Sequence, residues 1–499
     1  MADIFSYGYT PEEVGISSDS VRKIYKKIRD RKYMAHSILI ARNGKVCSEE
    51  YYEPFKQDEP HRMYSTSKSF AATAIGMLEG EGKLSINDKF IKYFPERIAD
   101  CKDEFLLETT IRDLLVMSTP FKIGATYSFY RNDWLDSFFY TKTTRPSGTF
   151  FMYDTSASFI LGVIAERVAG KPLMDYLCDN LISKIGGSKK LKCIKSPDGL
   201  PWMGSGVLCT TRDLARMGQI YLQKGEFEGE QLIPRQYAID ATSYQIDCNP
   251  EGSLLPASGY GYGYQIWLCQ KDCFAFKGMG GQFVIVSPKY NLLMAGTADV
   301  QGNSVGYNLM FDLFYDELLA PLEENDRESL PENKEAFKAL KEEIDKRECP
   351  IPMVGEKSSP FEEEYLDKTY KFEENDMQFE SLSLHKKADG SYGMKYFTRG
   401  EEKEITFKMG EYLIGTFPEK HYDGDLINQP IGREYRSMSA ALWTEQRKLV
   451  IRTYIIDEYI GNMTTTLAFK GDTVTVHNIK TAEHFLDEYP GIAVGYLKK

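Results

Sequence analysis

The stretch Tyr64-Ser65-Thr66-Ser67-Lys68-Ser69-Phe70 and the helix predicted to follow it constrain the fold more than any other part of the chain. An apolar face recurs at steps of three and four residues, formed by Phe70, Ala74, Met77 and Leu78. Glycines at positions 80 and 82 are typical of a helix end. A helix that begins near Ser65 therefore places Ser65 and Lys68 one turn apart on the same face.

This spacing is typical of a serine nucleophile and its base. A serine hydroxyl attacks carbonyl groups poorly until a neighbouring base takes its proton, and a lysine of depressed pKa can be that base. A helix N-terminus also favours developing negative charge. The pattern is common, however, since Ser20/Lys23 and Ser383/Lys386 repeat it, and a surface serine and lysine on an ordinary helix would show it too.

Length and composition narrow the class of protein. A chain of 499 residues is too long for one core, so two or three domains are expected. The net charge of -12 argues against binding to nucleic acid or to an anionic membrane surface. No signal peptide and no membrane span is expected, and nine scattered cysteines without a Cys-x-x-Cys pair indicate reduced thiols, so the predicted location is the cytoplasm.

Histidine placement excludes several kinds of site. The six histidines are His36, His61, His385, His421, His477 and His484. A Ser-His-Asp hydrolase would need its histidine from this short set. A zinc site built from several histidines is not expected, and no motif for a phosphate-binding loop is present. We therefore expect neither a metal nor a cofactor.

Other segments read as regular elements. Residues 18–31 predict a helix capped by Ser17 or Ser18, residues 36–41 and 46–52 predict two strands, and Asn43-Gly44 predicts the hairpin turn between them. A further helix is predicted to start at residue 110. Tyr153 lies on a predicted loop directly before a helix that ends at Gly170, where a phenol can pass protons between groups. It is one of 33 tyrosines, so a structural role fits the residue type equally well.

A glycine-rich region from 259 to 297 predicts three or four consecutive antiparallel strands. Glycines in a strand let another backbone or a ligand approach closely, although a β-bulge explains them as well. A backbone N–H at this edge, together with that of Ser65, could form an oxyanion hole.

The composition changes past residue 320. We expect a charged helical linker over residues 323–355 between a catalytic domain of residues 1–322 and a small antiparallel β-barrel or sandwich of residues 356–499. Packing or dimerisation is the simplest role for the last domain. A loop with His421 or Tyr422 that caps the site is a sharper alternative.

Taken in order, these segments resemble the serine β-lactamase and penicillin-binding-protein superfamily, in particular its class C-like esterase, D-aminopeptidase and amide-hydrolase branch. The matching segments are residues 65–70, 82–84, 94–96, 110–118, Pro146-x-Gly148-x-x-Phe151-x-Tyr153 and 204–216. The resemblance implies an α+β fold, with an antiparallel sheet flanked by helices and an all-helical lobe. It covers the part of the chain before the charged segment.

The resemblance also implies roles for particular residues. Ser65 would be the acylated nucleophile, Lys68 its base partner and Tyr153 the residue that passes protons to the leaving group. Met279 would supply the second oxyanion N–H. The residues that we assign to substrate binding are Thr155, Trp267, Gly278, Gly280 and Gln282. Tyr130 is a rival tyrosine, ranked lower because no matching flanks surround it.

Two departures from the family bear on the substrate. Asp154-Thr155 stands where the second motif usually has an asparagine, and Phe276-Lys277-Gly278 stands where the third motif usually has Lys or His, a hydroxyl residue and Gly. Phe276 cannot bind a substrate carboxylate in that position. We therefore predict a carboxylesterase acting on small neutral esters. An amide hydrolase or D-aminopeptidase and a non-catalytic peptide-binding descendant remain as alternatives, and the oligomeric state, including a homo-oligomer, stays open.

Overall fold

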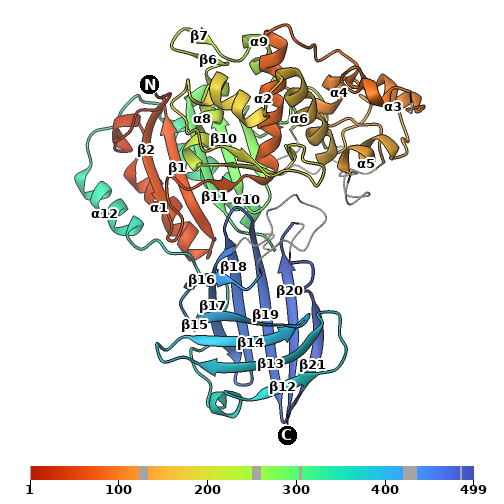
Figure 1. The fold of residues 1–499 in the computed structure, drawn as a ribbon. Coiled ribbons are helices and arrows are strands. Elements are labelled where there is room, and N and C mark those ends of the chain that lie inside the picture. The colour runs from red at the N-terminus through yellow and green to blue at the C-terminus, as the bar shows by residue number, and fades with distance from the viewer. Residues whose placement is uncertain are drawn as a thin grey trace. The chain divides into compact units, whose positions relative to one another are not determined.

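The computed structural model describes residues 2–99, 101–122, 133–249, 260–302, 306–419, 435–483 and 486–498. Their contacts divide the chain into two compact units, Met1–Cys349 and Pro350–Lys499 (Figure 1). Most of the segment predicted as a linker packs with the first unit. Within it, α12 (Lys334–Ile344) runs beside α1 (Ser18–Asp30), where Glu343 forms an ion pair with Arg29.

The first unit is built on a six-stranded antiparallel sheet in the order β2-β1-β11-β10-β9-β8. The strands are β1 (Ala35–Arg42), β2 (Lys45–Tyr51), β8 (Trp267–Leu268), β9 (Phe274–Gly278), β10 (Gln282–Ser287) and β11 (Leu292–Ala298). The predicted hairpin at Asn43-Gly44 is present, with both residues at positive φ. Of the three or four strands predicted from the glycine-rich region, the structure has four, β8 to β11. The hairpin strand β1 pairs with β11, so distant segments close the sheet.

Helices cover both faces of this sheet. Ser48 and Glu49 are consecutive on β2, so their side chains point to opposite faces. Tyr25 of α1 hydrogen-bonds Ser48, at 2.7 Å between the two oxygens, whereas Arg212 of α8 (Thr211–Leu222) binds Glu49. A Cβ at Gly218 of α8 would lie 2.4 Å from Cγ1 of a valine on β10, so a glycine is required for this close approach.

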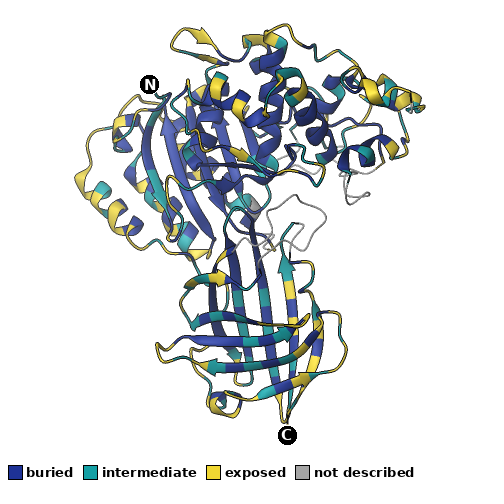
Figure 2. Ribbon diagram, in the orientation of Figure 1, coloured by how far each residue is buried: buried dark blue, intermediate teal, exposed yellow. Residues whose placement is uncertain are grey.

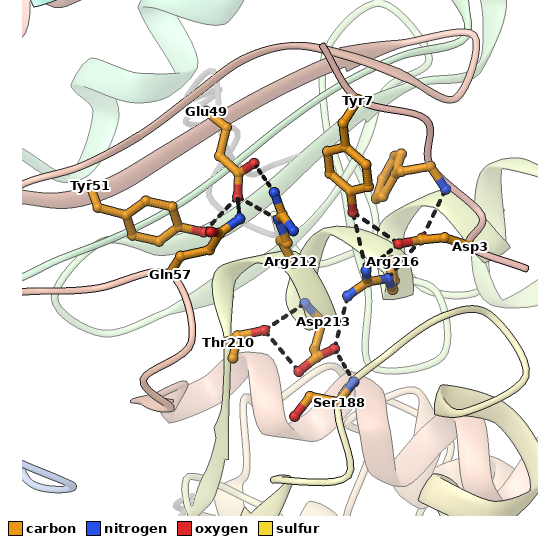
Figure 3. Close-up of polar contacts among 11 residues, drawn as sticks. Asp3, Tyr7, Glu49, Tyr51, Gln57, Ser188, Thr210, Arg212, Asp213 and Arg216 are labelled. Carbon is orange, nitrogen blue, oxygen red and sulfur yellow. Dashed lines mark hydrogen bonds and ion pairs between the residues drawn. The ribbon is translucent and has the colours of Figure 1, made fainter. Parts of the chain in front are cut away.

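Ion pairs fasten α8 to the start of the chain and to β2 (Figure 3). The Arg212 guanidinium donates from two nitrogens to the two Glu49 oxygens, both at 2.7 Å. Arg216 donates to both carboxylate oxygens of Asp3, at 3.1 and 2.6 Å, and to Asp213 at 3.1 Å. Burial raises the pKa of Tyr7, which contacts the same Arg216, to about 12. This network holds the N-terminal segment against the sheet layer.

The remaining helices of the first unit form a lobe around α2 (Ser67–Gly80). It includes α3 (Glu104–Glu108), α4 (Ile111–Leu115), α5 (Trp134–Tyr140), α6 (Thr155–Ala169), α7 (Leu173–Leu177) and α9 (Arg235–Ala241). In α2 every residue from Ser67 to Leu78 is buried, and α6 packs beside it (Figure 2). Thr110 caps α4 in a reciprocal box with Asp113, at the start predicted from sequence. This all-helical lobe and the sheet confirm the α+β prediction for the first unit.

The second unit is a closed β-barrel. Nine strands close the ring, because β15 (Glu401–Met409) pairs with β17 (Tyr435–Glu445) in parallel at Lys408 and Met409. The other strands are β12 (Thr369–Phe372), β13 (Phe379–Lys386), β14 (Tyr392–Thr398), β16 (Leu413–Phe417), β18 (Lys448–Ile456), β19 (Ile460–Lys470), β20 (Thr473–Thr481) and β21 (Gly491–Leu497), with β16 adding to β17 outside the ring. Of the predicted barrel or sandwich, the structure therefore has a barrel.

Side chains fill the barrel. Tyr365 stacks on Phe469, with ring centroids 4.0 Å apart, and Trp443 lies beside them. The buried Lys403 ammonium donates to Glu419 at 2.5 Å. Across both units, a search of the described residues finds no helix with the length and apolarity that membrane crossing requires.

Candidate active site

Ser65 lies at the junction between a short strand and helix α2. The strand β3 (His61–Arg62) leads through Met63 into a 3-10 turn, Tyr64–Thr66, and α2 begins at the next residue. Tyr64 has a φ of +48°, so the chain turns sharply just before Ser65. Ser65 is partly exposed while its neighbours Tyr64 and Thr66 are buried, so the turn presents the Ser65 hydroxyl.

Lys68 brings three segments together. Its side chain is buried, and Nζ donates to Ser65 Oγ at 3.3 Å, to Thr155 Oγ1 at 3.3 Å and to the Gly204 carbonyl oxygen at 2.5 Å. Ser65 comes from the first turn, Thr155 from the start of α6 and Gly204 from the turn before β5 (Val207–Cys209). The predicted pair Ser65 and Lys68 is therefore in contact in the structure.

Tyr153 faces Lys68 from the loop before α6. The Lys68 Nζ lies 5.2 Å from the centroid of the Tyr153 ring. The same ring stacks on Trp267 of β8, with centroids 5.5 Å apart and planes inclined by 25°. The N–H of Met152 donates to the Met117 carbonyl oxygen at 2.7 Å, which fixes the loop. Ser65, Lys68, Tyr153 and Trp267 therefore form one continuous group of side chains.

The Asp154-Thr155 pair divides between two roles. Asp154 caps α6: its Oδ1 accepts from the Ser156 N–H at 2.8 Å and its Oδ2 accepts from the Thr119 hydroxyl at 2.9 Å. Thr155 then presents its hydroxyl to Lys68. The residue that follows Tyr153 therefore stabilises a helix end, and the hydroxyl that contacts Lys68 comes one position later.

The turn between β9 and β10 approaches Ser65 from the sheet. A Cβ at Gly278 would lie 2.4 Å from the Met63 carbonyl oxygen, so this glycine lets β9 meet the segment that leads to Ser65. Met279 follows on the turn and is partly exposed, and Gly280 has a φ of +81°. This arrangement puts the Met279 segment beside the Ser65 turn.

Gln282, predicted from the sequence to bind substrate, hydrogen-bonds the backbone of this turn instead of facing its open side. Its Nε2 donates to the carbonyl oxygens of Met279 and Ala298, at 3.0 and 2.8 Å, and its Oε1 accepts from the Ala298 N–H at 3.1 Å. The side chain is only 1% exposed. Its amide is therefore engaged with backbone groups and supports the position of Met279.

In the third-motif region, Phe276 and the charged Lys277 lie on opposite faces of β9. Phe276 is buried and meets the Tyr221 ring edge-on at 5.8 Å. Lys277, the next residue, points to the other face and lies over the rings of Trp267 and Phe311, at 5.0 and 5.6 Å from their centroids. Burial lowers the pKa of Lys277 from its ordinary value. Lys277 therefore contacts the same Trp267 ring on which Tyr153 stacks.

Three residues at the back of the site were given no role from the sequence. Gly204 accepts from Lys68, Ser67 Oγ accepts from the Val207 N–H at 3.0 Å, and Arg62 lies buried beneath the turn. Ser67 and Gly204 belong to the matched segments 65–70 and 204–216, which is the signal that points to them, whereas the only signal for Arg62 is its nearness to Ser65.

Three residues considered from the sequence are not among those that the structure describes. Tyr130, His421 and Tyr422 fall outside the described residues. Within the described ranges, no group of three or more His, Cys, Asp or Glu side chains is placed to hold a metal ion. The chemistry that this group of side chains supports is proton transfer around a serine hydroxyl.

Comparisons with known proteins agree with this fold. The 6-aminohexanoate-dimer hydrolase of Paenarthrobacter ureafaciens is 24% identical over 305 residues, which cover 56% of this chain and 77% of the relative. A Bacillus anthracis structure classed as a 6-aminohexanoate-dimer hydrolase superposes with a TM-score of 0.52 at 20% identity, covering 66% of this chain and 89% of that one. A structure from Bacteroides dorei DSM 17855, classed as a β-lactamase, has a TM-score of 0.50 at 19% identity, covering 58% and 94%.

The fold and the matched relatives define a hydrolase of the β-lactamase and penicillin-binding-protein type, within the serine hydrolases. The Beta-lactamase family model matches residues 21–311, which is more than half of the chain. The chain belongs to that family, and the resemblance inferred from the sequence motifs is confirmed.

Proposed function

We propose that the chain hydrolyses small esters through an acyl-enzyme on Ser65. The observation that carries this proposal is the position of the Lys68 Nζ, 3.3 Å from Ser65 Oγ and 5.2 Å from the Tyr153 ring centroid. A general base must lie within hydrogen-bond reach of the proton that it takes, and such contacts are often long before substrate binds. Lys68 meets this requirement and also holds two fixed acceptors that orient it.

The proposed reaction has two halves. Ser65 Oγ attacks the substrate carbonyl carbon while its proton passes to Lys68 in its neutral form, and the backbone N–H groups of Ser65 and Met279 stabilise the oxyanion. The C–O bond to the leaving alcohol breaks, and Tyr153 donates the proton that the alcohol needs. Water then attacks the Ser65 ester and gives a proton to the Tyr153 phenolate, while the Lys68 ammonium returns its proton to Ser65 Oγ as the C–O bond to Ser65 breaks and the acid leaves.

The aromatic side chains of the site support the proposed substrate class. The rings of Tyr153, Trp267 and Phe151 line the wall of the site, with Phe151 and Trp267 centroids 6.0 Å apart. Phe276 is buried away from this wall, so it offers no group to a substrate. Aromatic rings bind apolar acyl or alkoxy groups best, which supports small neutral esters.

Amide hydrolysis is the second candidate. The observation that favours it is the likeness to a 6-aminohexanoate-dimer hydrolase, whose name states a dimer of 6-aminohexanoate as its substrate. Two amino acids joined through an amine and a carboxyl group form an amide, so this likeness supports amide substrates. Rates on p-nitrophenyl esters against amides of matched acyl groups separate the two activities, and D-amino-acid amides extend the test to D-aminopeptidase activity. A chain that binds peptides without hydrolysis would turn over none of these compounds.

The first experiment measures intact mass after exposure to a fluorophosphonate. We expect one adduct on the wild type and none on Ser65→Ala. The matched control is Ser383→Ala, which alters a Ser-x-x-Lys on strand β13, where residues three apart point to opposite faces. This control should keep the adduct. An unlabelled wild type across pH 7 to 10, the range in which a lysine of lowered pKa loses its proton, would count against an activated Ser65.

A further inference from the structure

Arg62 is a buried cation directly behind the nucleophile turn. It ends strand β3, three residues before Ser65, and is completely buried. Its guanidinium lies over two rings, 4.2 Å from the Tyr64 centroid and 4.9 Å from the Trp202 centroid. Its Nε donates to the Ser205 carbonyl oxygen at 3.3 Å, and its Nη2 donates to Ser205 Oγ at 3.2 Å. One side chain therefore contacts two segments that border Lys68 and Ser65.

The first of these segments supplies an acceptor to the base. Lys68 Nζ donates to the carbonyl oxygen of Gly204, and Arg62 binds both polar groups of Ser205, the next residue. Trp202, at the start of the same turn, stacks under the guanidinium. A shift of this turn would move the Gly204 carbonyl with it, because adjacent peptide groups are rigid planes.

The second segment carries the nucleophile. Tyr64 is held at a positive φ that residues with a side chain rarely adopt, and it directly precedes Ser65. The Arg62 guanidinium covers one face of its ring, while Gln301 Nε2 donates to its hydroxyl at 3.3 Å. These contacts support a backbone conformation that is otherwise unfavourable. Arg62 thus acts on the Ser65 side of the site as well.

We propose that Arg62 is a positioning residue that sets the distance between Lys68 and Ser65 by joining the Gly204–Ser205 turn to the Tyr64 turn. The inference rests on the proposed function, because it assigns Arg62 a role in the same reaction without contact to the substrate. A planar guanidinium can stack on rings and donate in fixed directions at once, which an ammonium cannot do. Lysine at position 62 therefore keeps the charge but not the geometry.

Contacts independent of Arg62 side-chain chemistry keep the local fold. The Met63 N–H donates to the Val207 carbonyl oxygen at 2.8 Å, and Ser67 Oγ accepts from the Val207 N–H. Strands β3 and β5 also pair through their backbones at Arg62 and Leu208. A variant at position 62 therefore retains the strand pairing while it loses the bond to Ser205.

The test compares Arg62→Met, Arg62→Lys and Ser205→Ala with the wild type, and uses Arg212→Met as a control. Arg212 forms an ion pair with Glu49 away from Ser65, so its variant loses an arginine without touching the site. Each variant is measured by thermal midpoint, by the rate of fluorophosphonate labelling across pH, and by kcat and KM on a neutral ester, all well below its midpoint.

We expect kcat and the labelling rate of Arg62→Met to fall about 100-fold, since small misplacements of reacting groups have effects of this size. KM should change by less than about threefold, because the interaction acts on the transition state more than on bound substrate. The pH at which labelling is half-maximal should shift, and Arg62→Lys should not restore the rate. Ser205→Ala, which removes one bond only, should lose about tenfold.

Two results would overturn the proposal. Labelling rates of folded Arg62→Met and Ser205→Ala equal to that of Arg212→Met would show that the link has no positioning role. An unchanged pH profile with a lower thermal midpoint alone would assign Arg62 to stability. If Arg62→Met does not fold, Ser205→Ala decides between these outcomes. Failure of the proposed function is distinguishable, since the wild type itself would then remain unlabelled.

Discussion

Replacing Gly204 by alanine tests whether the position of Lys68 depends on the backbone turn that receives its hydrogen bond. A Cβ at position 204 would lie 2.4 Å from Thr155 Cγ2 and 2.8 Å from the Thr155 carbonyl oxygen, where ordinary contact begins at 3.4 Å. Rotation of the Thr155 side chain cannot relieve the second contact, because that atom belongs to the backbone. With the Thr155 side chain kept where its hydroxyl meets Lys68, relief requires the turn and the start of α6 to separate by about 1 Å. If that side chain rotates, the backbone contact still requires about 0.6 Å, and the Thr155 hydroxyl leaves Lys68.

The expected loss of reaction rate comes from the hydrogen bond between Lys68 and Gly204, which this movement disturbs. Lys68 Nζ lies 2.5 Å from the Gly204 carbonyl oxygen, so a movement of this size takes the pair beyond normal hydrogen-bond distance. Thr155, which receives a second bond from Lys68, is the group that the new methyl pushes. Misplacement by about 1 Å commonly costs about 100-fold in rate. Overpacking should also destabilise the first unit by about 1–3 kcal/mol.

The assay is the second-order rate of fluorophosphonate labelling, with kcat for ester hydrolysis as a second measurement. Gly199→Ala is the matched control: it lies in the same loop at a φ of +79°, and a Cβ there meets nothing within 4 Å. This control should cost about 1 kcal/mol of stability through backbone strain and leave the labelling rate near that of the wild type. A Gly204→Ala variant that is folded and labels at the wild-type rate would refute the reasoning.

Three further predictions concern protonation and buried charge. Burial lowers the pKa of His61 from 6.5 to about 4 and that of His36 well below its ordinary value, so the folded state binds fewer protons than the unfolded state. The free energy of unfolding that is present above pH 6.5 should therefore fall toward pH 4, by up to about 1.4 kcal/mol per pH unit for each histidine. A urea midpoint of His61→Gln with the same pH slope as that of the wild type would contradict this. Tyr153→Phe should lower kcat about 100-fold or more on alkyl esters and less on p-nitrophenyl esters, whose leaving group needs no proton, and equal losses on both would remove Tyr153 from the role of proton donor. Lys403→Met should destabilise the barrel by about 3–5 kcal/mol in urea unfolding, because the Glu419 carboxylate stays buried without its partner. If the unpaired charge is the cause, the double variant Lys403→Met, Glu419→Gln should regain part of that stability.

Part of the fold was predictable because it depends on local spacing. The hairpin at Asn43-Gly44, the helix that starts at Thr110 and the helix that ends at Gly170 all follow from backbone preferences of a few adjacent residues. The start of α2 was predicted less well in detail, since a 3-10 turn at Tyr64–Thr66 precedes the helix. That turn forms where β3, Arg62 and Gln301 hold Tyr64, which are contacts that spacing does not encode.

In the third-motif region, too, the sequence pattern left one question to the tertiary structure. Alternation along β9 implies that Phe276 and Lys277 point to opposite faces, but not which face borders the site. Packing of Phe276 on Tyr221 and of Lys277 on Trp267 decides this. Likewise, alternating strands after residue 360 indicate a β domain, whereas the parallel pairing of Lys408 with Ala440 is what makes it a barrel.

The sequence by itself determined the family, the helix that follows Ser65 with Lys68 in its first turn, and the order of the main elements, because each is encoded in short-range periodicity or in a motif. Only the tertiary structure decided that Gly204 receives a hydrogen bond from Lys68 across 136 positions, that Gln282 supports the Met279 turn, and that Arg62 lies between the two halves of the site. These contacts join residues far apart in the chain, and close packing of the whole unit, rather than any local preference, selects which of them meet.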